Sequence, residues 1–119
     1  MMAALNTSRL NETFDIMTHP HRRYVLYHLR TQAGEVSIEA LAAAIANWDE
    51  AHSGKEKPLS TDDIKTMLHH NHIPKLADAG LITVGPAMDS IGLAGTDGLD
   101  RFLVDAAPID GPDQVTADD

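Results

Sequence analysis

Apolar side chains recur at helical spacing in the first third of the chain. Leu10, Phe14 and Met17 follow one another at intervals of four and three residues, which predicts a first helix over residues 9–17. A proline suited to the first turn of a helix opens the next stretch, and we expect a second helix over residues 20–31. Its apolar residues cover a wide arc, so this helix should lie at the centre of the core.

The middle of the chain predicts a short strand and a third helix. Residues 35–36 favour a strand. Ser37 then caps a helix whose apolar stripe begins at Ile38 and runs out near residues 47–50. Residues 51–59 are polar and include a glycine and a proline, so we expect them to form a loop.

Residues 60–80 carry the longest helical pattern. A serine at the start and two aspartates in the first turn suit a helix N-terminus. Gly80 is suited to the left-handed residue that ends a helix. Pro74 conflicts with this pattern, because it removes the hydrogen bond to the carbonyl of His70 and should kink the helix or restart it.

The C-terminal third predicts a β-ribbon and a last helix. Residues 81–84 favour a strand and residues 90–93 a weaker return strand. Apolar residues fit a short helix near residues 98–107, with Asp97 as its cap. We expect residues 1–8 to form a flexible lead-in, residues 9–107 one domain, and residues 108–119 an acidic disordered tail. The order of elements predicts a mainly α fold with a small β-ribbon.

Two parts of this pattern carry a family resemblance. The run from His72 to Ile82 resembles the junction between recognition helix and wing in winged helix-turn-helix regulators of the arsenic-repressor type. The span from Leu10 to Val84 is similar to a haloarchaeal family of small winged-helix domains, on the segments Pro20-His21-Arg22-Arg23-Tyr24-Val25-Leu26 and His72-Ile73-Pro74-Lys75-Leu76. The resemblance implies a winged helix-turn-helix fold and a homodimer that regulates transcription by binding double-stranded DNA. The recognition helix would then lie at about residues 60–79.

On this hypothesis the polar face of the recognition helix contacts DNA. Asparagine and histidine can hydrogen-bond base edges, and lysine can reach phosphate or guanine. The arginines that open the second helix could clamp backbone phosphates. Alternatively, they lie over the core and pair with Glu12 or Asp15. The residues expected to contact DNA are Arg22, Arg23, Lys65, Thr66, His69, His70, Asn71 and Lys75.

The charge of the chain argues against DNA binding. The formal net charge is −9 at pH 7, whereas nucleic-acid binders usually carry a basic face. Residues 85–119 hold eight acidic and one basic side chain, and residues 1–84 hold ten acidic and eight basic ones, so most of the excess lies in the C-terminal part. Asp62 and Asp63 stand early in the recognition helix, and residues 85–96 offer no lysine or arginine for a minor-groove contact.

A second hypothesis is therefore a winged-helix protein–protein interaction module with little or no DNA binding, whose acidic tail binds a basic protein partner or shields the DNA face. The placement of the cations separates the two hypotheses. A surface shared by Arg22, Arg23, Lys65 and Lys75 favours DNA, and acidic residues that interrupt it favour a protein partner. The Asp-rich, Lys-poor composition also indicates adaptation to high salt, where counterion release contributes little to DNA binding.

Several classes of function are not expected. Cysteine is absent, which excludes thiolate metal sites and a cysteine nucleophile. We find no catalytic constellation and predict neither an enzyme nor a cofactor. The chain shows no signal peptide and no apolar run long enough to span a bilayer, so we expect a soluble cytoplasmic protein without a membrane partner.

His69, His70 and His72 raise the question of a metal site. His69 and His72 are three residues apart and could share a helix face. A good zinc site needs three or four ligands, and His72 lies on the apolar stripe of Leu68 and Leu76. We therefore predict no metal site here, with His72 packed toward the core and His69 or His70 facing solvent.

Overall fold

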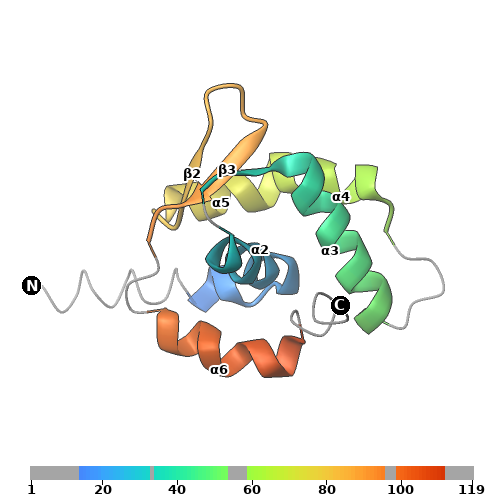
Figure 1. Cartoon of the computed structure of the whole chain (residues 1–119), viewed down its shortest axis with the longest axis vertical. Coiled ribbons are helices and arrows are strands. Elements are labelled where there is room, and N and C mark those ends of the chain that lie inside the picture. Colours follow the sequence, from blue (N-terminus) through green and yellow to red (C-terminus); the bar gives the residue numbers. More distant parts are fainter. Residues whose placement is uncertain (1–13, 33, 54–58, 96–98, 112–119) are drawn as a thin grey trace, which may run out of the picture.

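Helices make up most of the folded chain, and a small antiparallel sheet completes it (Figure 1). The computed structural model describes residues 14–32, 34–53, 59–95 and 99–111. The mainly helical class with a small β-ribbon is confirmed, and the short strand predicted near residue 36 joins that ribbon as a third strand. The elements in chain order are α2 (Pro20–Thr31), β1 (Val36–Ser37), α3 (Ile38–Ser53), α4 (Thr61–Met67), the π-helix η1 (Leu68–His72), α5 (Ile73–Asp78), β2 (Ile82–Val84), β3 (Ser90–Leu93) and α6 (Asp100–Asp110).

α2 lies at the centre of the core, as its wide apolar arc predicts. It packs against α3 and α6, and Figure 1 shows it enclosed between them. Its buried apolar side chains include Tyr24, Leu26 and Leu29. The bounds of α2 coincide with the prediction: a proline fixes its first turn, and its last residue, Thr31, is followed by Gln32, whose backbone is extended.

The sheet has the strand order β1-β3-β2 and is antiparallel throughout. Val36 of β1 and Val84 of β2 pair with Ile91 from opposite sides of the central strand β3. Gly92 follows in β3, and a Cβ atom there would lie only 3.3 Å from Thr83 Oγ1 of β2. A glycine at this position therefore allows the hairpin β2–β3 to close tightly.

α3 connects the sheet to the helical layer. Ser37 caps it, since its Oγ accepts a backbone N–H of the first turn at 3.0 Å. The backbone N–H of Ile38 donates to the carbonyl of Asp89 at 2.8 Å, which ties the start of α3 to the turn of the hairpin. The helix continues to Ser53, beyond the end predicted near residues 47–50.

The helical stretch predicted over residues 60–80 is present, but it is not uniform. It begins as α4, widens into the π-helix η1 and ends as α5. At the wide turn the N–H of Ile73 donates to the carbonyl of Leu68, five residues back instead of four. Pro74 then falls in the first turn of α5, where a missing backbone N–H costs least. The α-helix thus resumes at Ile73, directly before Pro74, which agrees with the predicted kink or restart.

The C-terminal helix extends further than the pattern near residues 98–107 predicts. α6 continues through residues 108–110 and ends at Gly111, whose φ of 73° is left-handed. The expectation of a disordered acidic tail from residue 108 onward is therefore wrong for these residues. The cause is a tertiary contact of Asp110 with α2, described below. The rest of that predicted tail, residues 112–119, lies outside the described residues.

At the other end of the chain, residues 14–17 are helical, in agreement with the predicted first helix. Met17 is buried as expected, but Phe14 of the same predicted apolar stripe is 51% exposed. The remainder of that helix and the lead-in fall within residues 1–13, outside the described part of the chain, and so does Asp97, the expected cap of α6. None of the described helices is long and apolar enough to cross a membrane.

Candidate nucleic-acid interface and histidine cluster

An open groove lies between the N-terminal half of the long helical stretch and the turn that joins β2 to β3. We name it the helix–hairpin groove. Met88 is exposed in the turn and has a left-handed φ of 57°. The groove brings together four of the eight residues that the sequence predicted to contact DNA. Its lining consists of Asp62, Lys65 and Thr66 from α4, His69 and His70 from η1, and Met88.

This groove carries little net positive charge. Lys65 Nζ lies 2.7 Å from Glu39 Oε1 of α3, and this hydrogen bond raises the pKa of Lys65 and lowers the pKa of Glu39. Asp62 contributes a carboxylate to the lining itself. His70 is exposed and His69 is half-buried, so their rings supply hydrogen-bonding nitrogens. The groove is therefore suited to directional polar contacts more than to charge neutralisation.

Two further residues that the sequence predicted to contact DNA lie outside the groove lining. Asn71 of η1 and Lys75 of α5 are exposed. Within the described residues Lys75 forms no ion pair, so its charge is available to a partner.

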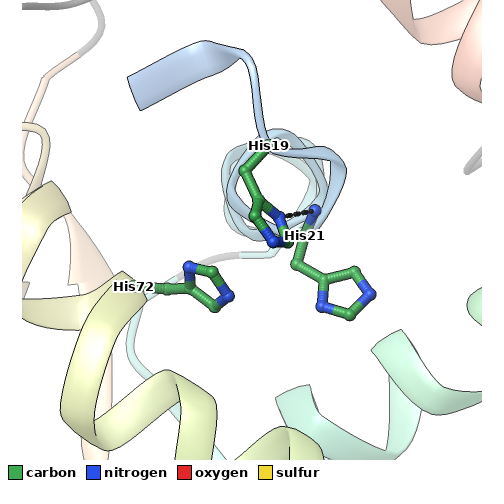
Figure 2. A group of neighbouring side chains, drawn as sticks. All are labelled: His19, His21 and His72. Carbon is green, nitrogen blue, oxygen red and sulfur yellow. Dashed lines mark hydrogen bonds between the residues drawn. The ribbon is translucent and has the colours of Figure 1, made fainter. Parts of the chain in front are cut away.

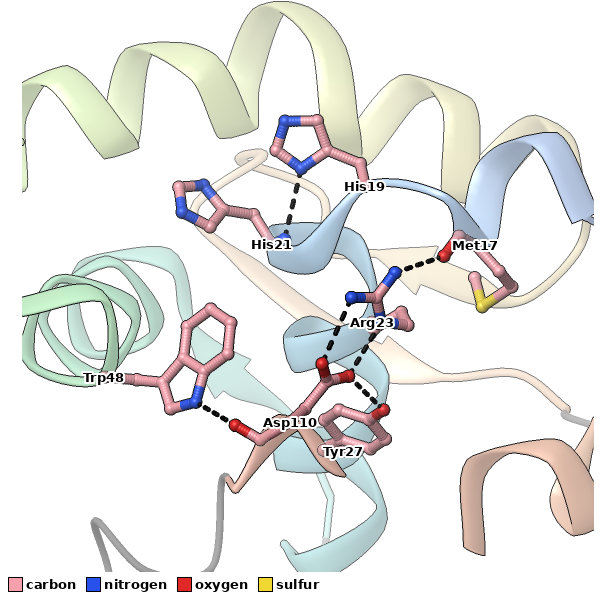
Figure 3. Close-up of polar contacts among 7 residues, drawn as sticks. All are labelled: Met17, His19, His21, Arg23, Tyr27, Trp48 and Asp110. Carbon is pink, nitrogen blue, oxygen red and sulfur yellow. Dashed lines mark hydrogen bonds and ion pairs between the residues drawn. The ribbon is translucent and has the colours of Figure 1, made fainter. Parts of the chain in front are cut away.

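Arg23 is held inside the protein by the end of α6 (Figure 3). Its Nε and Nη2 donate to Oδ2 and Oδ1 of Asp110 at 2.7 and 3.1 Å, and its Nη1 donates to the carbonyl of Met17 at 2.7 Å. The hydroxyl of Tyr27 donates to the same carboxylate, and Trp48 Nε1 donates to the backbone carbonyl of Asp110 at 2.9 Å. We name these five residues the Asp110 network.

The Asp110 network favours the interpretation in which Arg23 packs over the core. The hydrogen bond with Asp110 raises the pKa of Arg23, and burial raises the pKa of Tyr27. Arg23 thus pairs with a carboxylate over the core, as one interpretation held, but its partner is Asp110 instead of Asp15. Glu12, the other expected partner, lies outside the described residues. All three of its guanidinium nitrogens donate hydrogen bonds within the chain.

Arg22 contacts a buried histidine. Its Nε donates to His72 Nδ1 at 3.0 Å, which connects the start of α2 to η1. The prediction for the register of this helix is confirmed, because His72 is fully buried while His70 is exposed. Burial, with contributions from the charges of His19 and Arg22, lowers the pKa of His72 to about 3. The His72 ring is therefore neutral near pH 7.

Three histidines from two distant segments meet beside Arg22 (Figure 2). His19 caps α2 and His21 lies in its first turn, while His72 belongs to η1. One ring nitrogen of each lies within 4.8 Å of the other two. The ring centroids are 4.4 Å apart for His19 and His72, 5.2 Å for His19 and His21, and 6.0 Å for His21 and His72. We name this group the histidine cluster.

Each ring of the cluster uses one nitrogen for a contact at its periphery. His19 Nδ1 accepts the backbone N–H of His21 at 3.1 Å, and His21 Nε2 lies 3.3 Å from Asp49 Oδ1. His72 Nδ1 is occupied by Arg22. The second nitrogens of His21 and His72 are buried without a hydrogen-bond partner among the described residues. In Figure 2 they face the space between the three rings, so the cluster has the composition of a metal-binding group.

Sequence reasoning did not find this cluster. It compared His69, His70 and His72 because they are neighbours in the chain, and of these only His72 takes part. A usable signal is the run from His19 to His21, in which a proline fixes the first turn of α2 between the two histidines. Nothing in the sequence shows that η1 crosses this end of α2.

A protein-family model described as "Domain of unknown function (DUF7344)" matches residues 14–91, which are 78 of the 119 residues. The matched region includes the helix–hairpin groove and the histidine cluster and excludes α6. No curated protein and no solved structure matches the chain.

Proposed function

The chain belongs to this family of unknown function, so its role has to be inferred from its own residues, and we propose that it is a DNA-binding transcription regulator of the winged helix-turn-helix type. One observation carries the proposal: a long helical stretch with one exposed polar face stands directly before a β-hairpin, and a groove lies between the two. In this assignment α4, η1 and α5 form the recognition helix and the hairpin β2–β3 is the wing. Dimers of such domains place two recognition helices one helical turn apart on DNA.

Polar residues along the groove are suited to read base edges. Thr66 and His70 are exposed on the face of the helix that borders the hairpin. Each can hydrogen-bond bases in the major groove, and the exposed Met88 can make an apolar contact with a thymine methyl group. Lys75 is suited to contact phosphate beside this face.

The proposal predicts an unusual dependence on salt. Each phosphate contact adds about 0.9 to the slope of log K against log salt. Because Lys65 is paired with Glu39 and Arg23 with Asp110, few cations remain for phosphates. Binding should therefore depend on base and shape contacts, with a shallow salt slope.

Fluorescence anisotropy tests the proposal. The affinity of the full chain is measured for the upstream DNA of its own gene and for a random duplex, each at several salt concentrations. Lys75→Gln should weaken binding to both duplexes and reduce the salt slope by about 1. His70→Ala should weaken binding to the upstream DNA alone. The matched control is Arg101→Gln, since Arg101 is an exposed cation of α6, away from the groove.

Two outcomes would overturn the assignment. Equal losses for Lys75→Gln and Arg101→Gln would mean that DNA does not contact the proposed face. Absence of binding to any duplex at low salt would favour the second candidate function.

That second candidate is a protein–protein interaction module, and the pairing of the cations favours it. Of the four cations whose shared surface would favour DNA, Lys65 is bound by Glu39 and Arg23 by Asp110. A partner protein would then use the groove for its polar and apolar side chains. Substitution of Met88 by Asp should weaken a protein complex through the hairpin turn, and cross-linking of the partner to residues of this turn would support this candidate.

A further inference from the structure

Three buried polar atoms at the histidine cluster have no hydrogen-bond partner among the described residues. They are His21 Nδ1, His72 Nε2 and Asp49 Oδ2. Burial of unpaired polar atoms is unfavourable, so the space that the two ring nitrogens face is suited to a polar ligand. His19 completes the set with Nε2, because its Nδ1 accepts the backbone N–H of His21.

The donor chemistry indicates a cation. Imidazole nitrogens are common ligands of divalent transition metals. His21 shows the arrangement of a metal-binding histidine, because Nε2 contacts the carboxylate of Asp49 and Nδ1 is left to bind an ion. The same carboxylate supplies negative charge beside the cluster. His72 is neutral near pH 7, as a metal ligand must be.

We propose that His19 Nε2, His21 Nδ1 and His72 Nε2 bind a divalent transition-metal ion such as Zn²⁺, and that Arg22 competes with this ion for His72. The inference is independent of DNA binding. Zinc bonds of about 2.0–2.1 Å in tetrahedral geometry hold nitrogen ligands about 3.4 Å apart. One ring nitrogen of each histidine lies within 4.8 Å of one ring nitrogen of the other two, so a bound ion would draw the rings together. With three protein ligands, the fourth position is open to water.

The competition follows from the positions of the protons. Arg22 Nε only donates, so His72 Nδ1 must be the acceptor and the proton of the neutral ring resides on Nε2. Ligation through Nε2 moves that proton to Nδ1, where it faces the N–H of Arg22. Metal binding therefore breaks the hydrogen bond between Arg22 and His72, and the guanidinium charge opposes the ion as well.

Metal binding by His19 also costs a hydrogen bond, although this cost is smaller. Its Nδ1 also accepts a hydrogen bond, from the backbone of His21, and ligation through Nε2 releases it. The side chain is half-buried, so the ion can enter from this edge. A site with two such costs should bind an exchangeable ion, more weakly than a closed structural zinc site.

Calorimetric titration with Zn²⁺ tests the site, with the full chain prepared without a polyhistidine tag and treated with a chelator. One ion should bind per chain near pH 7. His19→Gln and His72→Gln should each weaken binding by about tenfold or more. The matched control is His70→Gln, since His70 belongs to the same π-helix as His72 but is exposed and outside the cluster.

The result that would overturn the site is a wild-type chain without one-to-one binding, in which case an ordered water occupies the space between the rings. The proposed site would also be wrong if His70→Gln lost zinc binding and His19→Gln retained it, because the ion would then bind at the surface. His72 is fully buried, so circular dichroism must show that His72→Gln folds. If it does not fold, His19→Gln still tests the site, because His19 is only half-buried.

Arg22→Met tests the competition separately, because methionine retains most of the apolar stem and removes the charge and the donor. This variant should bind Zn²⁺ more tightly than the wild type. Unchanged or weaker binding would refute the competition. Imidazole nitrogen chemical shifts give a direct readout: Nδ1 of His72 should be unprotonated without zinc and protonated with it.

Discussion

Arg23 and Asp110 stand 87 positions apart in the chain and form a two-point ion pair, at 2.7 and 3.1 Å (Figure 3). The pair joins the first half of α2 to the last residue of α6. Both side chains are largely withdrawn from solvent, with exposed fractions of 18% and 13%. Loss of one member of such a pair leaves the other charge uncompensated, so the end of α6 contributes to the stability of the fold.

Asp110→Asn should lower the free energy of unfolding by about 2–4 kcal/mol, because it removes the charge opposite Arg23 and retains the shape of the side chain. Denaturant titration followed by circular dichroism measures this. The control is Asp105→Asn, which breaks an exposed pair with Arg101 and should cost less than about 0.5 kcal/mol. Similar losses in both variants would contradict a structural role for Asp110.

Truncation gives a second test of this contact. A chain that ends after Ala107 lacks the Asp110 network, and a chain that ends after Gly111 retains it. The shorter chain should melt at a clearly lower temperature, by about 4–8 °C for each kcal/mol lost in a domain of this size. Equal melting temperatures would show that α6 adds little to the domain.

Gly80→Ala should destabilise the protein by about 1–2 kcal/mol, since Gly80 adopts a left-handed φ of 78° at the end of α5. A methyl group there would meet no atom within 4 Å, so the cost is conformational alone. Gly95→Ala is the control, because its surroundings are equally open and its φ is not left-handed. Its unfolding free energy should change by less than about 0.5 kcal/mol.

The stability of the metal-free protein should fall in mild acid. Burial lowers the pKa of His19, His28 and His72 below the ordinary value of 6.5, the last to about 3. Below pH 6.5 the unfolded chain therefore binds more protons than the folded one. The free energy of unfolding consequently decreases as pH decreases.

Each such histidine contributes at most about 1.4 kcal/mol per pH unit to this slope. Denaturation midpoints between pH 7 and pH 5, in the presence of a chelator, should measure it. His28→Gln removes one contribution outside the histidine cluster and should flatten the slope. An identical slope in this variant would show that His28 does not take part.

Local signals predicted the parts of the fold that depend on neighbours in the chain. Pro20 sets the start of α2, and Gly80 ends α5 with the expected left-handed backbone. The apolar stripe also placed His72 in the core. Each of these features depends on steric or burial preferences within a few residues, which a sequence pattern contains.

The rest depends on contacts between distant segments. The acidic composition after residue 107 predicted disorder, and only the contacts of Asp110 with Arg23, Tyr27 and Trp48 explain why the helix continues to Asp110. The histidine cluster likewise needs η1 to pass the N-terminus of α2. Spacing along the chain cannot show such crossings, because they are set by how the helices pack.

The wide turn of η1 sets how α4 and α5 are rotated relative to each other about the helix axis. It contains one residue more than an α-helical turn, so all later positions are rotated by about 100° from where a continuous helix would carry them. Thr66 precedes the turn and borders the groove, while Leu76 follows it and is fully buried. Deletion of one residue from 68–72 would remove the wide turn and leave these two faces aligned, because that turn absorbs one extra residue. Closure of the turn to a regular α-helical one without a deletion would misalign them by that angle. The size of a single turn thus determines which side chains the hairpin stands beside.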